Sequence, residues 1–118
     1  MTIAVYLRVS KEGGDSIVNQ RNLILDFIRH TPEWDGAMIQ EFCDDGCSGR
    51  NFDRPAVAKL LKLVKEGRIS CIIVKDLSRF GRNYIETGEY LEKIFPFLGV
   101  RFIAVNDSFD SWNAASAE

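Results

Sequence analysis

Near its start the sequence reads Ile3-Ala4-Val5-Tyr6-Leu7-Arg8-Val9-Ser10, an apolar run that leads directly into polar side chains. The run predicts a strand, and alternate residues of a strand share a face, so Arg8 and Ser10 should point to the same side. A guanidinium beside a serine hydroxyl at the end of a strand indicates phosphate chemistry. Acyl transfer would instead need a histidine base, and His30, the single histidine, lies in a helical pattern far along the chain.

Working outward from this strand, apolar spacing predicts strands and helices in alternation. Further strands are expected at 37–43, 70–75 and 101–105. A helix of about four turns should start near Asp15 or Ser16, either of which can cap it. A second helix should begin at Pro55, bury one stripe and end at Gly67, and a third should cover 84–98, with Pro96 disturbing its last turn. The expected stripe of the second helix is Val57, Leu60, Leu61 and Val64.

This alternation predicts an α/β fold with a mainly parallel central sheet and helices on both faces. In such sheets, ligands bind at the carboxyl ends of the strands. The loops expected at those ends carry Arg8 with Ser10, then residues 45–54, then residues 78–82. Segments that are distant in sequence should therefore bring their polar side chains to one rim of the sheet.

Composition limits the function classes. The 118 residues are 46% hydrophobic and 27% charged, which suits one globular domain. The net charge of −2 argues against nucleic-acid binding through the overall field, so any DNA affinity must be local. We expect a cytoplasmic protein, because the sequence shows neither a signal peptide nor an apolar stretch long enough to span a membrane. The three cysteines predict neither a disulfide framework nor, without a second pair of ligands near Cys43 and Cys47, a metal site.

Arginines gather near the expected rim. A cluster of guanidiniums around one hydroxyl would bind a phosphate and stabilise a pentacovalent transition state, each charge-assisted bond contributing about 1.5–3 kcal/mol. The alternative is that each arginine is an ordinary surface or ion-pair residue. Neither G-x-x-x-x-G-K-[ST] nor G-x-G-x-x-G occurs, and convergent carboxylates are lacking, so we expect chemistry without a nucleotide cofactor or metal.

Three motifs together resemble the catalytic domain of the serine site-specific recombinases, the resolvase/invertase family. Their residues are most similar to those of the large serine recombinases. The motifs are Tyr6-Leu7-Arg8-Val9-Ser10, Asp45-Gly46-Cys47-Ser48-Gly49 leading to Arg54-Pro55, and Leu77-Ser78-Arg79-Phe80-Gly81-Arg82. They occur in family order over nearly the whole chain. The resemblance implies a three-layer, resolvase-like fold.

The resemblance also implies a mechanism. Ser10 would attack a DNA phosphodiester, forming a 5′-phosphoserine link and freeing a 3′ hydroxyl, so that strands are rejoined without ATP or metal. By position, the matching site residues are Arg8, Arg54, Arg79 and Arg82, the motif aspartate Asp45, and Gln20 on the first helix. Small resolvases usually carry aspartate where this chain has Ser78, which leaves the proton acceptor and the leaving-group acid unassigned.

The implied partners are double-stranded DNA at specific attachment sites and further copies of the full-length protein, as a homodimer or tetramer. We expect the catalytic domain at 1–106 and a polar tail at 107–118, ending before the family's dimerisation helix and DNA-binding domains, and little activity from the fragment alone. Two alternatives remain open. One is a non-enzymatic flavodoxin-like module that binds a phosphorylated ligand or a protein partner, and the other is a phosphotransferase or phosphatase that uses Ser10 on small molecules.

Overall fold

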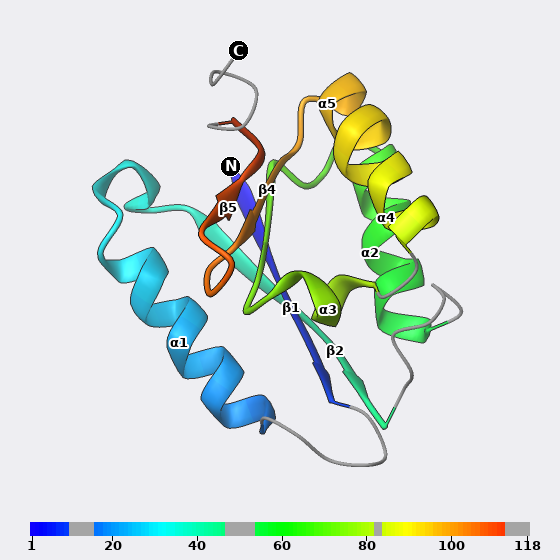
Figure 1. The fold of residues 1–118 in the computed structure, drawn as a ribbon. Coiled ribbons are helices and arrows are strands. Elements are labelled where there is room, and N and C mark those ends of the chain that lie inside the picture. Colours follow the sequence, from blue (N-terminus) through cyan, green and yellow to red (C-terminus); the bar gives the residue numbers. More distant parts are fainter. Residues whose placement is uncertain (10–15, 47–53, 82–83, 113–118) are drawn as a thin grey trace.

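A five-stranded sheet forms the centre of the protein, with strand order β2-β1-β3-β4-β5 (Figure 1). The computed structural model describes residues 1–9, 16–46, 54–81 and 84–112. The strands are β1 (Thr2–Val9), β2 (Met38–Asp45), β3 (Cys71–Val74), β4 (Arg101–Ala104) and β5 (Phe109–Asp110). The first four are mutually parallel, as the alternating pattern predicted, and β5 pairs with β4 in the antiparallel sense.

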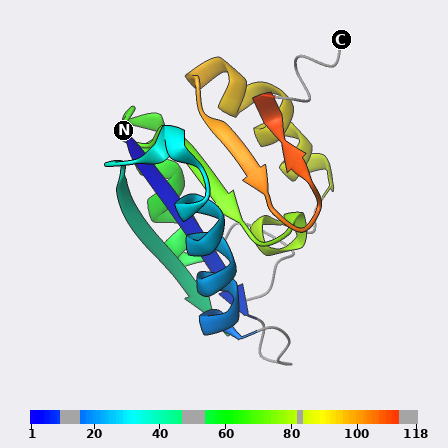
Figure 2. The ribbon, with the colours of Figure 1, turned by 90° about the vertical axis from the view of Figure 1, so that its left-hand side faces the viewer.

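Helices cover both faces of this sheet. Helix α1 (Ile17–Arg29) lies on one face, while α2 (Pro55–Lys65), α4 (Tyr84–Glu89) and α5 (Phe95–Leu98) lie on the other. Figure 2 shows α1 in front of the sheet and α2 behind it. The predicted three-layer α/β fold is therefore confirmed. None of the helices within the described ranges is long and apolar enough to cross a membrane.

Local sequence explains where the first two long helices begin and end. Ser16 caps α1, its hydroxyl accepting from the Asn19 N–H at 3.0 Å. Pro55 occupies the first turn of α2, where its missing N–H costs nothing. Gly67 follows α2 with φ +77°, a left-handed conformation that favours glycine. The four residues of the predicted α2 stripe are the buried residues of that helix.

The helical segment after residue 84 is less regular than predicted. A π-helical turn, η2 (Tyr90–Ile94), separates α4 from α5 and is closed by a hydrogen bond from the Phe95 N–H to the Tyr90 carbonyl. The irregular part thus lies before Pro96, which sits in the first turn of α5. The loop expected after the third strand contains a short helix, α3 (Leu77–Phe80), capped by Asp76. A 3-10 turn, η1 (Pro32–Trp34), precedes β2.

The chain beyond residue 106 contributes to the sheet. We expected 107–118 to be only a polar tail, but β5 pairs Phe109 with Ala104 and Asp110 with Ile103. The Arg101 guanidinium binds Asp110 through both carboxylate oxygens, at 3.0 and 2.5 Å, and its Cζ lies 4.7 Å from the centre of the Trp112 ring. The sequence did not predict this strand, because a strand of two residues is too short to show a periodic pattern.

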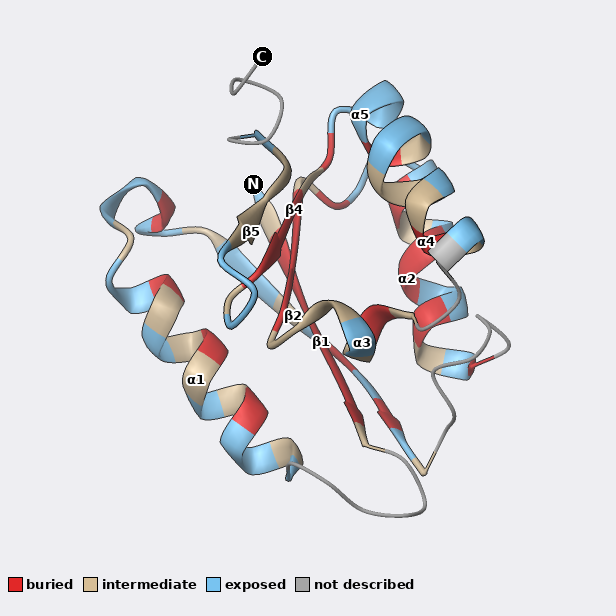
Figure 3. Ribbon diagram, in the orientation of Figure 1, coloured by how far each residue is buried: buried red, intermediate tan, exposed pale blue. Residues whose placement is uncertain are grey.

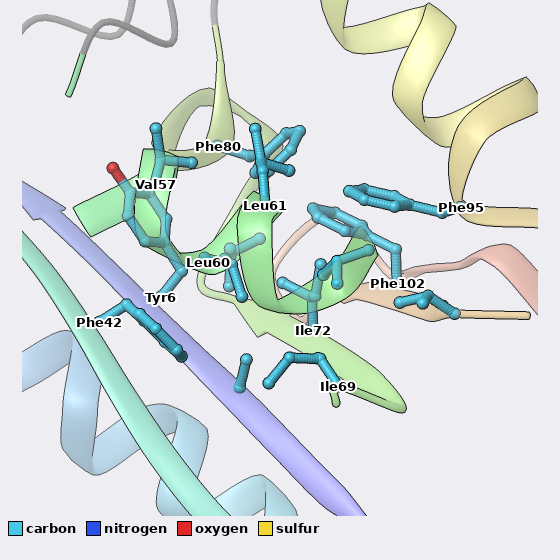
Figure 4. Packing of buried hydrophobic residues seen from close by; sticks show 14 of the residues in the cluster. Tyr6, Phe42, Val57, Leu60, Leu61, Ile69, Ile72, Phe80, Phe95 and Phe102 are labelled. Atoms are coloured by element: carbon cyan, nitrogen blue, oxygen red, sulfur yellow. The ribbon is translucent and has the colours of Figure 1, made fainter. Parts of the chain in front are cut away.

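The core has two parts, one on each face of the sheet, and β1 and β3 are buried on both faces (Figure 3). The part beneath α2 and α5 contains a cluster of phenylalanines (Figure 4), in which the Phe80 and Phe102 ring centres lie 5.0 Å apart. Phe80 belongs to α3, so this packing anchors α3 to the sheet.

Candidate active site

The strands end at different heights, and this difference creates the candidate site. β1 pairs with β2 over its whole length, Thr2–Val9, but with β3 only from Ile3 to Val5. The edge of β1 beyond Val5 therefore has no strand beside it on the β3 side. Helix α3, which follows β3, lies next to this part of β1 (Figure 1).

Arg8 is buried in this region rather than directed into solvent. Its side chain comes from β1, and the residue is 1% exposed. Its Nε donates to the Arg79 carbonyl at 3.0 Å, and its Nη2 donates to the Ser78 carbonyl at 2.8 Å. The guanidinium thus binds the main chain of α3, whose last carbonyls have no helical N–H to pair with.

Gln20, on α1, also contacts the edge of β1 that β3 leaves open. The residue is fully buried on α1, and its side-chain amide forms two bonds with the main chain of Arg8. Its Oε1 accepts from the Arg8 N–H at 3.3 Å, and its Nε2 donates to the Arg8 carbonyl at 2.9 Å. The predicted site residue Gln20 is therefore in direct contact with the strand that leads to Ser10.

Arg54, the residue before α2, also binds the main chain of α3. It is 2% exposed, and its Nη1 donates to the Tyr6 hydroxyl at 2.8 Å and to the Arg79 carbonyl at 3.1 Å. Its Nη2 donates to the Phe80 carbonyl. Its Cζ also lies 5.6 Å from the centre of the Tyr6 ring, a cation–π distance.

Arg79 completes the described cluster. Its Nη1 donates to the Arg8 carbonyl at 3.2 Å, and its Nε lies 3.7 Å from Asp76 Oδ2. Asp76 also accepts from the Arg79 N–H at 3.2 Å and from the Ser78 hydroxyl at 2.6 Å. Ser78, the departure from the small-resolvase pattern, is thereby part of the cap of α3.

Asp44 and Asp45 take opposite sides of β2. Asp44 is 3% exposed and accepts from the Tyr6 hydroxyl at 2.8 Å and from the N–H groups of Ala56 and Val57 at 2.9 and 3.0 Å. Asp45, the predicted site residue, is exposed, and the strand register places it beside Val9. Among the described residues, Asp44 rather than Asp45 is thus joined to the arginine cluster, through the Tyr6 hydroxyl that Arg54 also binds.

Sequence reasoning missed the roles of Asp44 and Tyr6. The Tyr6 ring lies in the core (Figure 4), and its hydroxyl joins the polar network. Burial raises the pKa of Tyr6 far above its usual value, so the hydroxyl stays protonated. A detectable signal was the alternation Phe42-x-Asp44 on the buried face of β2, because a buried carboxylate requires hydrogen-bond donors.

Ser10 and Arg82 lie outside the described residues, as does Cys47. Among the residues that are described, the structure brings together Arg8, Arg54, Arg79 and Gln20, from four separate segments of the chain. The described ranges contain no group of three or more His, Cys, Asp or Glu side chains that could hold a metal ion. Three guanidiniums therefore bind main-chain carbonyls of α3 and of Arg8, near the end of the strand that precedes the predicted nucleophile in the sequence.

Comparison with known proteins places this geometry in context. A sequence model described as "Resolvase, N terminal domain" matches residues 3–117. The N-terminal catalytic domain of TP901-1 integrase is similar with a TM-score of 0.82 and 25% identity, over 99% of this chain and 86% of that one. A search of curated proteins gave no significant match.

Two further solved structures are similar over most of the chain. A resolvase family site-specific recombinase from Streptococcus pneumoniae has a TM-score of 0.63 and 27% identity, over 99% of this chain and 84% of that one. The C-terminal catalytic domain of ISC1926 TnpA, an IS607-like serine recombinase, has a TM-score of 0.70 and 25% identity, over 89% and 70% of the two chains.

Proposed function

Because the chain belongs to the resolvase family and is the catalytic domain of a DNA recombinase, we propose that Ser10 is the nucleophile that breaks the DNA strand. The Ser10 oxygen attacks the phosphorus, the bond from phosphorus to the 3′ oxygen breaks, and a 3′ hydroxyl leaves. The strand end is then held as a 5′-phosphoserine ester. Attack by a 3′ hydroxyl on this ester reverses the step and frees Ser10, so no ATP is consumed, and the proposed step uses no metal ion.

One observation carries this proposal. Arg8, Arg54 and Arg79 come from separate segments, yet all three guanidiniums bind main-chain carbonyls at the end of β1 or in α3. This concentrates positive charge at the end of β1, the strand that precedes Ser10 in the sequence. Guanidiniums held in fixed positions stabilise the extra negative charge of a pentacovalent phosphate without having to reorganise during the reaction. Arg82, which follows the same α3 segment, is proposed to join them.

Gln20 and Asp45 have supporting roles in the proposal. Gln20 binds the main chain of Arg8 and so helps to fix the end of β1, which leads to Ser10. Asp45 ends β2 beside Val9, the residue before Ser10, and its exposed carboxylate can orient an arginine at the rim. The proton acceptor for Ser10 is not assigned to either residue.

As a recombinase domain, the chain acts on DNA and functions in an oligomer. Specific attachment sites in double-stranded DNA, and assembly of the full-length protein as a homodimer or tetramer, belong to the proposal, as does a cytoplasmic location. We further propose that the catalytic domain extends through Trp112, because β5 pairs with β4 and Arg101 binds both Asp110 and Trp112.

Trapping the covalent adduct tests the proposal. The protein carrying its DNA-binding region is mixed with DNA that contains an attachment site and a nick beside the cleavage point, so that the cut end diffuses away. We expect protein joined to 5′ ends, none with Ser10→Ala, and normal adduct with the matched control Ser16→Ala, which removes only the cap of α1. An adduct formed by Ser10→Ala would refute the assignment of the nucleophile. The absence of any adduct would favour the phosphoryl-ligand binding module.

A further inference from the structure

Helix α3 is held at its N-terminal end as well as at the carbonyls that the two buried guanidiniums bind. Asp76, its N-cap residue, accepts from the Arg79 N–H at 3.2 Å. An N-cap side chain reaches the second or third N–H of a helix, so the first N–H needs an acceptor from elsewhere. Asp107 supplies it, since its Oδ2 accepts from the Leu77 N–H at 2.7 Å. A carboxylate 30 residues further along the chain thus binds the first residue of α3.

Asp107 lies in the turn that joins β4 to β5, and this turn is bonded to the segment before α3. The Val105 N–H donates to the carbonyl of Val74, the last residue of β3, at 3.0 Å. The Asn106 N–H donates to the Lys75 carbonyl at 2.8 Å. With Asp107, three consecutive residues of the turn therefore hold the chain as it passes from β3 into α3.

The backbone on the other side of Asp107 is also constrained. Ser108 has φ +51°, in the left-handed region that residues other than glycine rarely adopt. Its N–H donates to the Val105 carbonyl at 3.2 Å, and Phe109 then pairs with Ala104. A strained conformation persists only where the surrounding structure determines it. Because an aspartate side chain is short, this fixed turn determines where the Asp107 carboxylate lies.

The position of Leu77 matters for the site because α3 has a single turn. The helix covers four residues, of which Arg79 is the third. Phe80, fully buried, anchors the last residue to the core, while the Arg79 Nη1 donates to the Arg8 carbonyl at 3.2 Å. A shift of the first residue about this anchor would change the direction of the Arg79 side chain. Asp107 is exposed, so its contribution comes from this bond rather than from burial.

We propose that Asp107 is a positioning residue for strand cleavage, which fixes the first residue of α3 and thereby the guanidinium of Arg79. The inference rests on the proposed function, since it assigns Asp107 a role in the reaction of Ser10. A purely structural cap would change the stability of the domain and leave the cleavage rate of the folded protein unchanged. A positioning residue changes that rate, and it must provide an acceptor oxygen at the right place rather than a negative charge.

Three substitutions of Asp107 separate placement from charge. Asp107→Ala removes the acceptor. Asp107→Asn keeps an acceptor oxygen at the same reach without the charge, whereas Asp107→Glu keeps the charge but displaces the oxygens by one methylene group. The matched control is Ser16→Ala, which removes an exposed cap from α1.

Hydrogen exchange of the Leu77 amide measures the bond itself in the 118-residue chain. After correction for global stability, we expect exchange in Asp107→Ala and Asp107→Glu to be faster than in the parent protein. Exchange in Asp107→Asn and Ser16→Ala should stay close to that of the parent, because both keep an acceptor for the Leu77 N–H.

The adduct assay measures the consequence for the reaction. At saturating protein, where DNA affinity does not limit the rate, we expect Asp107→Ala to slow covalent adduct formation by about 10- to 100-fold, because a small misplacement of a reacting group costs this much. Asp107→Asn should recover most of the rate, Asp107→Glu should recover less, and Ser16→Ala should match the parent.

Three results would overturn the inference. They are a parent-like cleavage rate in Asp107→Ala, unchanged Leu77 exchange in that variant, and a faster rate in Asp107→Glu than in Asp107→Asn, which would show that charge rather than placement matters. If Asp107→Ala does not fold, the order of the other two variants still decides the question. Failure of the nucleophile assignment would be recognised separately, by an adduct that survives Ser10→Ala.

Discussion

Replacing Gln20 by methionine tests how the end of β1 is held. Methionine has a similar length and flexibility, so the fully buried position stays filled while both bonds to the Arg8 main chain are lost. Each buried hydrogen bond contributes a net of about 0.5–1.5 kcal/mol, so the two together predict a loss of about 1–3 kcal/mol in the free energy of unfolding.

Urea denaturation measures this loss. The fluorescence of Trp34, buried on the α1 side of the sheet, reports unfolding. With a slope of about 1–3 kcal/mol per molar urea, a loss of about 2 kcal/mol lowers the midpoint by about 0.7–2 M. The matched control is Asn22→Ala, an exposed position on the same helix, for which we expect a change within about 0.5 kcal/mol.

Hydrogen exchange of the Arg8 amide adds a local readout. Because the Gln20 side chain accepts from this N–H, exchange should be faster in Gln20→Met than in Asn22→Ala after correction for global stability. Equal midpoints for the two variants, together with an unchanged Arg8 exchange rate, would refute the reasoning and show that α1 does not hold the strand end.

Three further predictions concern the rest of the domain. Asp110→Asn should lower the free energy of unfolding by about 1–3 kcal/mol, measured in a thermal melt. The side chains of Arg101 and Asp110 are only 13% and 15% exposed, and they are joined by two hydrogen bonds. A parent-like melt would show that β5 adds no stability. Gly88→Ala should stabilise the domain by about 0.5–1 kcal/mol, and Gly99→Ala should destabilise it by about 1–2 kcal/mol. An added methyl group meets no atom within 4 Å at either position, but of the two only Gly99 has a positive φ, +73°. Urea midpoints that shift in the same direction for both variants would contradict this. Burial raises the pKa of the Cys71 thiol to about 12, so its reactive thiolate should become abundant only as the pH approaches that value; iodoacetamide at pH ~8 should modify exposed Cys43 before Cys71, and mass spectrometry showing the reverse order would count against the burial.

Much of the fold was predictable because the buried positions have clear periods. The continuous apolar run of β1 and the stripe of α2 specify a buried strand and an amphipathic helix without any knowledge of tertiary contacts. The π-helical turn before Pro96 and the two-residue strand β5 were not predictable in this way. Both depend on tertiary packing, and neither leaves a repeat in the sequence.

Sequence motifs predicted several of the described residues that lie together, but not the hydrogen bonds that join them. Motif positions identified Arg8, Arg54, Arg79 and Gln20, which the structure brings together. Pattern alone could not show that the two buried guanidiniums bind carbonyls of α3, because main-chain acceptors have no sequence signature. The role of Asp44 was missed for the same reason, since its partners include main-chain N–H groups.

The short β3 has a consequence for how the domain can change shape. Since β3 leaves the end of β1 after Val5, α3 is attached there by side-chain bonds to its carbonyls and by the Phe80 ring, not by a ladder of main-chain bonds. The sheet can therefore stay intact as a rigid platform while α3 is repositioned as a unit. Such a movement of α3 would cost these side-chain bonds and the packing of the buried Phe80 ring, but it would not unfold any strand.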